Sequence, residues 1–219
     1  MAKNKIYWLL LLLVGGFAGA YFYSNKQNKP IRTLPYFEPK SLTKIKSKTH
    51  HSVPAFSFVN QNNQTVTEQT VNGKVYVCDF FFTTCQSICP KMSTQLERVY
   101  AAFKTRNDFL ILSHTVNPET DSVAQLKEYA QKHGVTDLHW LFLTGDKKHL
   151  YELARKGYLL NAEEGDGGED DFIHTQNFAL VDKERCIRGF YDGTDSVEVT
   201  RLLKDINLLF EEYAYKEKE

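Results

Sequence analysis

The feature that most constrains the fold is residues 74–92, KVYVCDFFFTTCQSICPKM. Residues 75–82 are apolar, β-branched or aromatic except for Asp79, which is typical of a central strand that is covered on both faces. Two cysteines, Cys85 and Cys89, follow the strand closely. Paired thiols at the end of a buried strand indicate a functional site whose chemistry is that of sulfur.

The residues around the cysteines predict the start of a helix. Thr83 and Thr84 offer hydroxyls that could cap a helix beginning near Cys85. If that turn is helical, Cys85 and Cys89 stand at positions i and i+4 and face the same way. Pro90 requires either an irregular first turn or a regular helix that begins close to it. Thiols at a helix N-terminus are well placed to ionise.

The rest of the chain predicts an alternation of strands and helices. Residues 55–59 and 64–67 predict a β-hairpin, followed by the strand at 75–82 and its helix. Further strands are expected at 109–116, 139–143, 177–181 and 186–191, and further helices from Thr120 or Asp121 to about 133, at 147–156, and from Asp195 or Ser196 onward. This order predicts an α/β fold: a thioredoxin-like mixed sheet with helices on both faces and an added N-terminal hairpin.

The N-terminus predicts a membrane anchor. Residues 1–5 contain two lysines, and residues 6–23 are uncharged and long enough to span a bilayer, so the first five residues are expected in the cytoplasm. A cleaved signal peptide, ending at the A-x-A site of residues 18–20, is the alternative. Residues 24–52 predict a linker, residues 53–213 the thioredoxin-like domain, and residues 214–219 a polar tail. The domain is expected on the outer side of a bacterial cytoplasmic membrane.

Composition excludes several classes of protein. The chain has 27 basic and 27 acidic residues, without the basic excess that nucleic-acid binding requires. Four cysteines are too few for a disulfide scaffold.

Three chemistries use paired cysteines on this plan. A disulfide exchanger has two residues between its cysteines and a proline before the later strand, whereas Cys85 and Cys89 have three residues between them and no proline lies near 178–181. A thiol peroxidase favours threonine where this chain has Phe82. Metal binding needs a further ligand, and His174, on the loop before residues 177–181, is the best candidate. Two thiolates and an imidazole suit Cu(I) and can hold Cu(II), whereas zinc prefers a fourth ligand.

The segment FFFTTCQSICPKMS, the later histidine and the anchor together resemble the Sco/SenC copper-delivery proteins over residues 51–210. The resemblance implies that Cys85, Cys89 and His174 bind one copper ion. It also implies a role in assembling the dinuclear copper centre of cytochrome c oxidase, with an apo-oxidase subunit as partner and a copper donor or thiol reductant as a second. Cys85 and Cys89 could form a disulfide when metal-free.

The predicted function is that of a metallochaperone rather than an enzyme. A thiol-disulfide oxidoreductase that keeps the oxidase cysteines reduced is the first alternative, and a redox or copper sensor is the second. Cys78 and Cys186 are expected to be bystander thiols, and Met92 to pack beneath the cysteines. The sequence leaves open whether Asp79 is satisfied near the site or lies on an edge, and whether the acidic loop 163–171 steers basic partners or is only solvated.

Overall fold

The computed structural model describes residues 14–17, 32–39, 50–160, 173 and 175–217. The chain divides into two compact units, Met1–Arg32 and Thr33–Glu219. Residues 14–17 of the first unit are helical. Among the described residues, none of the helices has the length and apolar character needed to cross a bilayer, and most of the span predicted at residues 6–23 lies outside them.

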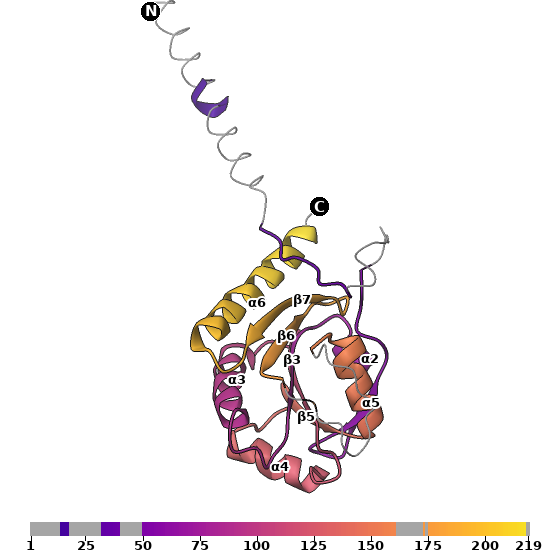
Figure 1. Cartoon of the computed structure of the whole chain (residues 1–219). Helices are drawn as coiled ribbons and strands as arrows, with labels where there is room; N and C mark the ends of the chain where they lie inside the picture. The colour runs from indigo at the N-terminus through magenta and orange to yellow at the C-terminus, as the bar shows by residue number, and fades with distance from the viewer. Residues whose placement is uncertain (1–13, 18–31, 40–49, 161–172, 174, 218–219) are drawn as a thin grey trace, which may run out of the picture. The chain divides into compact units, whose positions relative to one another are not determined.

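A seven-stranded mixed sheet forms the centre of the second unit, in the order β2-β1-β5-β4-β3-β6-β7 (Figure 1). β3, β4 and β5 are parallel, while β1 pairs antiparallel with β5, and β6 pairs antiparallel with both β3 and β7. The predicted hairpin is confirmed and extends the sheet beyond β5. The strands are β1 Ser57–Asn60, β2 Thr65–Thr67, β3 Val75–Phe81, β4 Phe109–Thr115, β5 Trp140–Thr144, β6 Asn177–Val181 and β7 Ile187–Asp192.

Helices cover both faces of this sheet (Figure 1). α3 (Cys89–Phe103), α4 (Val123–Lys132) and α6 (Ser196–Lys216) enclose one apolar core. α2 (Glu68–Val71), α5 (Lys147–Glu152) and the π-helix η1 (Leu153–Gly157) enclose the other. The predicted mixed sheet with helices on both faces is therefore confirmed. The short α2 is not predicted by the sequence, and α6 continues to Lys216, into the residues expected to form a polar tail.

The prediction that a helix begins near Cys85, capped by Thr83 or Thr84, is wrong. α3 begins at Cys89, and its N-cap residue, Ile88, makes no side-chain capping bond. Pro90 stands in the first turn, where its missing N–H costs nothing, so the regular helix begins beside it. Cys85 therefore lies in an irregular loop between β3 and α3.

Residues 33–39, which we call the strap, pack on the domain although their sequence predicts part of a linker. Leu34 is buried in the core beneath α3 and α6. The Phe37 N–H donates to the carbonyl of Ile187 at 3.0 Å, and the Phe37 ring contacts Phe190 edge-on at 5.1 Å. The strap is thus bonded to the beginning of β7.

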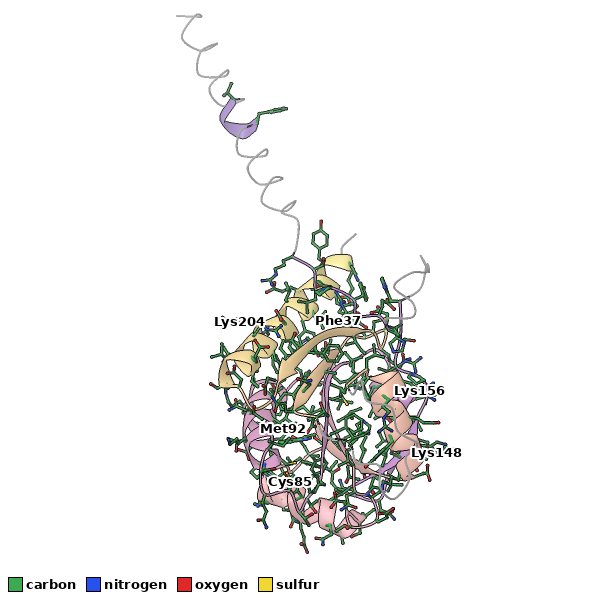
Figure 2. The ribbon with its side chains drawn as sticks, viewed as in Figure 1. Phe37, Cys85, Met92, Lys148, Lys156 and Lys204 are labelled. Carbon is green, nitrogen blue, oxygen red and sulfur yellow. The ribbon has the colours of Figure 1, made fainter. Side chains whose placement is uncertain are left out.

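The strap and the cysteines lie at opposite ends of the sheet. Because β6 is antiparallel to both β3 and β7, the start of β7 lies at the end where β3 begins, whereas Cys85 follows the end of β3. Phe37 and Cys85 are accordingly far apart in Figure 2. The chain enters the domain at the end remote from the cysteines.

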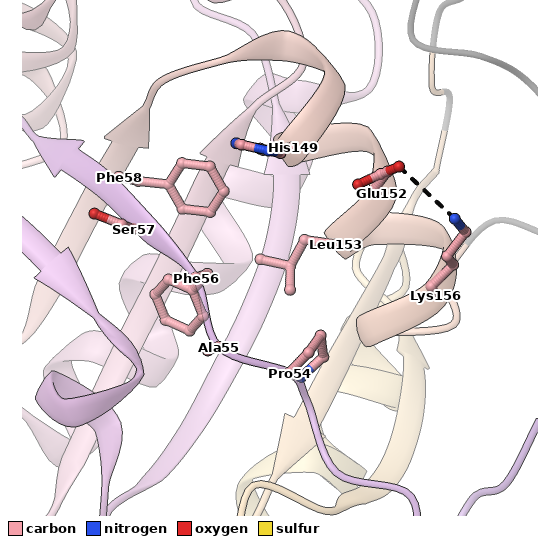
Figure 3. Close-up of a pocket in the computed structure, with 9 residues that line it drawn as sticks. All are labelled: Pro54, Ala55, Phe56, Ser57, Phe58, His149, Glu152, Leu153 and Lys156. Carbon is pink, nitrogen blue, oxygen red and sulfur yellow. Dashed lines mark ion pairs between the residues drawn. The ribbon is translucent and has the colours of Figure 1, made fainter.

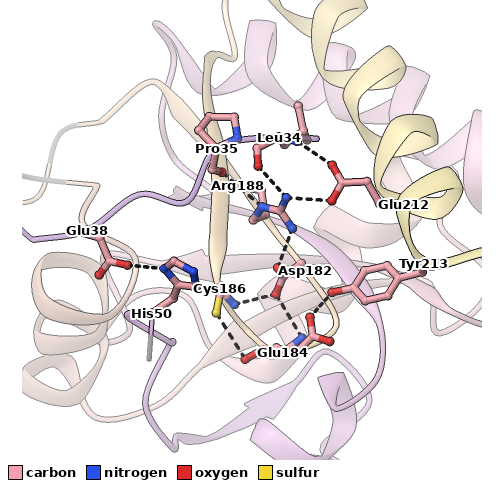
Figure 4. A network of polar contacts seen from close by, with 10 residues as sticks. All are labelled: Leu34, Pro35, Glu38, His50, Asp182, Glu184, Cys186, Arg188, Glu212 and Tyr213. Atoms are coloured by element: carbon pink, nitrogen blue, oxygen red, sulfur yellow. Dashed lines mark hydrogen bonds and ion pairs between the residues drawn. The ribbon is translucent and has the colours of Figure 1, made fainter. Parts of the chain in front are cut away.

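A buried charge network fastens the strap (Figure 4). The Arg188 guanidinium on β7 is 1% exposed and pairs with Asp182 and with Glu212 of α6, each at 2.9 Å. It also donates to the carbonyl of Leu34 at 2.7 Å, while Glu212 accepts the Leu34 N–H at 2.6 Å. The ring of Tyr36 lies 4.1 Å from the guanidinium. The sequence gives no local signal for this network, because Leu34 lies more than 150 residues before Arg188 and Glu212.

Candidate metal and thiol site

The structure brings Cys85 and Cys89 together. The Cys89 N–H, at the first residue of α3, donates to the Cys85 sulfur at 3.4 Å. The Cys85 N–H is bonded to the carbonyl of Phe82 at 3.2 Å, and the Ser87 hydroxyl lies 3.7 Å from the Cys85 sulfur. Cys85 is partly exposed, whereas Cys89 is only 3% exposed. One thiol is therefore accessible and the other is held behind it.

The pKa values of the two thiols differ because their surroundings differ. Partial burial raises the pKa of Cys85, but hydrogen bonds from Cys89 and from the backbone of Cys89 and Ser87 outweigh it and lower the pKa to about 7. Burial, and the hydrogen bond that Cys89 gives to Cys85, raise the pKa of Cys89 to about 12. The expectation that the helix start favours thiolate is thus confirmed for Cys85 only, because the first free N–H of α3 points at its sulfur.

We expect alkylation of the reduced, metal-free protein to show this asymmetry. Since only the thiolate reacts, the rate at Cys85 should fall about tenfold per pH unit below pH 7 and level off above it. Cys89 should stay unmodified over the same range. Iodoacetamide labelling followed by mass spectrometry measures both rates, with the urea-unfolded chain as control, where Cys85 should titrate near pH 8.5. A native midpoint at that same value would contradict the hydrogen-bonding account.

The floor of the site is apolar and well packed. Met92 is 1% exposed and belongs to the core beneath the cysteines, as the sequence predicts. Ser93 lies one turn of α3 beyond Cys89, and its hydroxyl is 2.8 Å from the Tyr129 hydroxyl of α4. This contact joins the two helices below the thiols.

Asp79 is satisfied inside the sheet, which settles the alternative that the sequence leaves open. It is 2% exposed and accepts a hydrogen bond from the Ser113 hydroxyl of the neighbouring strand β4. Ser113 in turn accepts the indole N–H of Trp140 at 2.8 Å. Burial raises the pKa of Asp79 to about 7, although the bond from Ser113 opposes that shift.

Asp121 contacts the loop before α3 and is not the helix cap that the sequence predicts. The sequence predicts Thr120 or Asp121 as the cap of α4, but Ser122 is the cap and accepts the Gln125 N–H at 3.3 Å. The carboxylate of Asp121 is fully buried and instead bonds to Thr83 in the loop of residues 82–88, which we call the cysteine loop, and to Thr115 at the end of β4. Several polar residues precede α4, and their local pattern does not tell the residue that caps the helix from one that bonds to a residue distant in the sequence.

His174 lies outside the described residues, but its neighbours are placed. Ile173 is buried in the second core, and the Thr175 hydroxyl accepts the Asn177 N–H at 3.2 Å where β6 begins. Because β6 runs antiparallel to β3, it begins at the end of the sheet where β3 ends. Within the described part of the chain, His, Cys, Asp and Glu side chains form no group of three that could hold a metal ion.

The two other thiols, Cys78 and Cys186, are buried. Burial raises the pKa of Cys78, which is fully enclosed in β3. Burial also raises the pKa of Cys186 to about 11, with Asp182 and Glu184 adding to the shift. Neither thiol is paired in a disulfide.

A groove of about 570 Å³ lies away from the cysteines, between the start of β1 and the helices α5 and η1 (Figure 3). Its walls are mainly apolar and include Phe56, Phe58 and Leu153, with the ion pair of Glu152 and Lys156 at its rim. None of the four cysteines lines it. The thiol chemistry therefore belongs to the loop before α3 and not to this groove.

Comparisons with known proteins agree with this fold. The family described as SCO1/SenC matches residues 44–209. An SCO1 protein homolog of Bacillus subtilis (strain 168) is 31% identical over 164 residues, which cover 74% of this chain and 84% of that protein. The similarity thus extends over most of both chains.

Solved structures give the same result. BsSco, described as a member of the Sco family of cytochrome c oxidase assembly proteins with a disulfide switch, has a TM-score of 0.64 at 27% identity, covering 83% of this chain and 98% of its own. ScoI of Arabidopsis thaliana, solved with copper bound, has a TM-score of 0.55 at 25% identity, covering 70% and 97%. These likenesses confirm the predicted thioredoxin-like fold. The chain belongs to the SCO1/SenC family.

Proposed function

We propose that this protein is a copper carrier in the assembly of cytochrome c oxidase, and that Cys85, Cys89 and His174 hold its copper. The observation that carries the proposal is the adjacency of the two thiols, with the Cys89 N–H 3.4 Å from the Cys85 sulfur. Membership of the SCO1/SenC family and the copper bound to the related ScoI support it.

The donor set fits copper. Two sulfur ligands suit Cu(I), and an added imidazole allows the site to hold Cu(II) as well. Thiols bind metals as thiolates, so copper must displace the proton of Cys89, whose pKa is raised, and that of the fraction of Cys85 that is still protonated. Copper affinity should therefore increase with pH. The apolar packing of Met92 beneath the pair keeps the thiol-bearing helix start in place.

His174 is proposed as the third ligand because of its place in the chain. In the sequence it stands between Ile173 and Thr175, just before β6, and β6 begins at the end of the sheet where β3 ends and the loop to Cys85 starts. In the proposed arrangement residues 6–23 anchor the protein in the bacterial cytoplasmic membrane, with the domain on the outer side. There it would receive copper from a donor and pass it to the apo-oxidase subunit that carries the dinuclear centre.

His174→Ala is expected to weaken Cu(II) binding by at least about 100-fold, because even outer partners of metal ligands contribute 10- to 100-fold. Cu(I) binding should change less, since two thiolates already satisfy that ion. The matched control is His149→Ala, which removes an exposed histidine of α5, a helix that packs on the other core of the sheet than α3. Cu(II) titration followed by absorption and electron paramagnetic resonance spectra measures the effect. Unchanged affinity and spectra in His174→Ala would remove this histidine from the site.

The acidity difference between the thiols also supports a second function, thiol-disulfide exchange. Cys85 as a thiolate would attack a disulfide of the oxidase subunit and form a mixed disulfide, releasing one target thiolate. Cys89 would then attack Cys85, which releases the second target thiolate, reduces the target by two electrons and leaves Cys85–Cys89 oxidised. A disulfide switch is described for the related BsSco.

Cellular complementation separates these functions. In cells that lack the protein, His174→Ala should fail to restore oxidase activity if the protein is a copper carrier. It should restore the activity fully if the protein is a thiol reductase. The third possibility, a redox or copper sensor, predicts changes in transcription that persist in cells without the oxidase.

A further inference from the structure

We propose that Asp121 is the positioning residue of the site, because its carboxylate ties the loop that carries Cys85 to the end of β4. The inference rests on the proposed function, because it takes Cys85 and Cys89 as the metal-binding thiols. It assigns to Asp121 a task that no local sequence pattern indicates.

The contacts of Asp121 connect three segments. Its carboxylate accepts the Thr83 hydroxyl at 2.5 Å and the Thr83 N–H at 3.2 and 3.3 Å, in the loop after β3. It also accepts the Thr115 hydroxyl, at the end of β4, at 2.5 Å. Asp121 itself precedes α4 and is held by its N–H bond to the carbonyl of Asn117 at 2.9 Å. One side chain thus joins the ends of two adjacent strands to the entrance of a helix.

The burial of Asp121 strengthens its dependence on these hydrogen bonds. Asp121 is 0% exposed, and a carboxylate that has left water must recover its hydrogen bonds from the protein. The Asp121 carboxylate is the acceptor in all of these bonds, and hydrogen bonds to a carboxylate are stronger than those between neutral partners. Thr84, Gln86 and Ser87, farther along the cysteine loop, are exposed. The fixed point of the loop is therefore Thr83, two residues before Cys85.

The position of Thr83 decides where the Cys85 sulfur lies. Cys85 reaches the N–H of Cys89 only if the loop leaves β3 in the direction that the Asp121 contacts impose. If those contacts are lost, the Cys85 sulfur moves away from the start of α3 and the two sulfurs separate. A site that needs both sulfurs at once is sensitive to such a shift.

Substitution of Asp121 tests this role. Asp121→Ala should weaken copper binding by about 10- to 100-fold, as expected for the loss of a group that orients a ligand. It should also slow the alkylation of Cys85 at pH 7 several-fold in the metal-free reduced protein. Asp121→Asn keeps the size and one carbonyl oxygen, so it should recover a large part of both properties. Copper titration and iodoacetamide labelling of the purified full-length protein give the two readouts.

Ser122→Ala is the matched control. It removes the cap of α4 from the adjacent residue and should lower Tm, but Ser122 does not bond to the cysteine loop. Its copper affinity and Cys85 alkylation should therefore equal those of the wild type. Equal losses in Ser122→Ala and Asp121→Ala would overturn the proposal, because the effect would then be one of general stability.

A second variant covers the case in which Asp121→Ala does not fold. Thr83→Val keeps the shape of the threonine and removes only its hydroxyl, so it should shift both readouts in the same direction by a smaller amount. Wild-type values in Thr83→Val, or in a folded Asp121→Ala, would overturn the proposal. If the wild type itself bound no copper, the proposed function would fail, while the alkylation rates would still decide the role of Asp121.

Discussion

Cys85→Ser is expected to weaken copper binding by more than about 100-fold, since this thiol is a direct ligand and even outer partners contribute 10- to 100-fold. Serine keeps the size of the residue but replaces a soft, readily ionised sulfur with a hard hydroxyl, which Cu(I) binds poorly. Cys89 would remain with a raised pKa and no neighbouring sulfur. Competition titration with a Cu(I) chelator measures the loss.

Cys186→Ser provides the control for this experiment. Cys186 is buried at the turn between β6 and β7, at the end of the sheet remote from Cys85. Its replacement changes the number of thiols by the same amount and should leave copper affinity unaltered. If Cys85→Ser bound one copper ion as tightly as Cys186→Ser, Cys85 would not be a ligand.

Arg188→Met is expected to lower the free energy of unfolding by about 3–5 kcal/mol, the usual cost of removing one partner from a buried ion pair. The variant leaves the carboxylates of Asp182 and Glu212 buried without their cation. It also removes the bond from the guanidinium to Leu34, so the strap should loosen. Urea denaturation at pH 7 measures the change, and limited proteolysis within the strap reports its release.

An exposed arginine gives the comparison. Arg106 pairs with Asp108 at 2.9 Å, but both side chains are substantially exposed. Arg106→Met should therefore cost less than about 1 kcal/mol, as is usual for surface ion pairs. A cost of that small size for Arg188→Met would show that the buried network does not hold the strap.

Much of the fold follows from the pattern of the sequence. Residues 75–82 and 109–116 are rich in apolar, aromatic and β-branched residues, as expected of strands covered on both faces, and β3 and β4 lie there. Local signals also found the hairpin and the last helix. The start of α3 was misplaced because Thr83 has the residue type of a cap but bonds to Asp121 instead.

Long-range polar contacts are the part that the sequence could not reveal. Leu34 of the strap is more than 150 residues from Arg188 and Glu212 in the sequence, and nothing in their neighbours indicates that they meet. The same is true of Asp79 and Ser113, which lie on adjacent strands. For the candidate site, the cysteine motif identified Cys85 and Cys89, while the unequal acidity of the pair depends on where α3 begins and could come only from the structure.

The most direct test of the copper-carrier account is a copper titration of the purified full-length protein, first reduced and then with Cys85 and Cys89 oxidised to a disulfide. The account predicts one tightly bound copper ion per reduced chain and none per oxidised chain, because both sulfurs are needed as thiolates. Reduced chains that bind no copper tightly, yet exchange a Cys85–Cys89 disulfide readily with other thiols, would contradict the account and assign the site to thiol reduction.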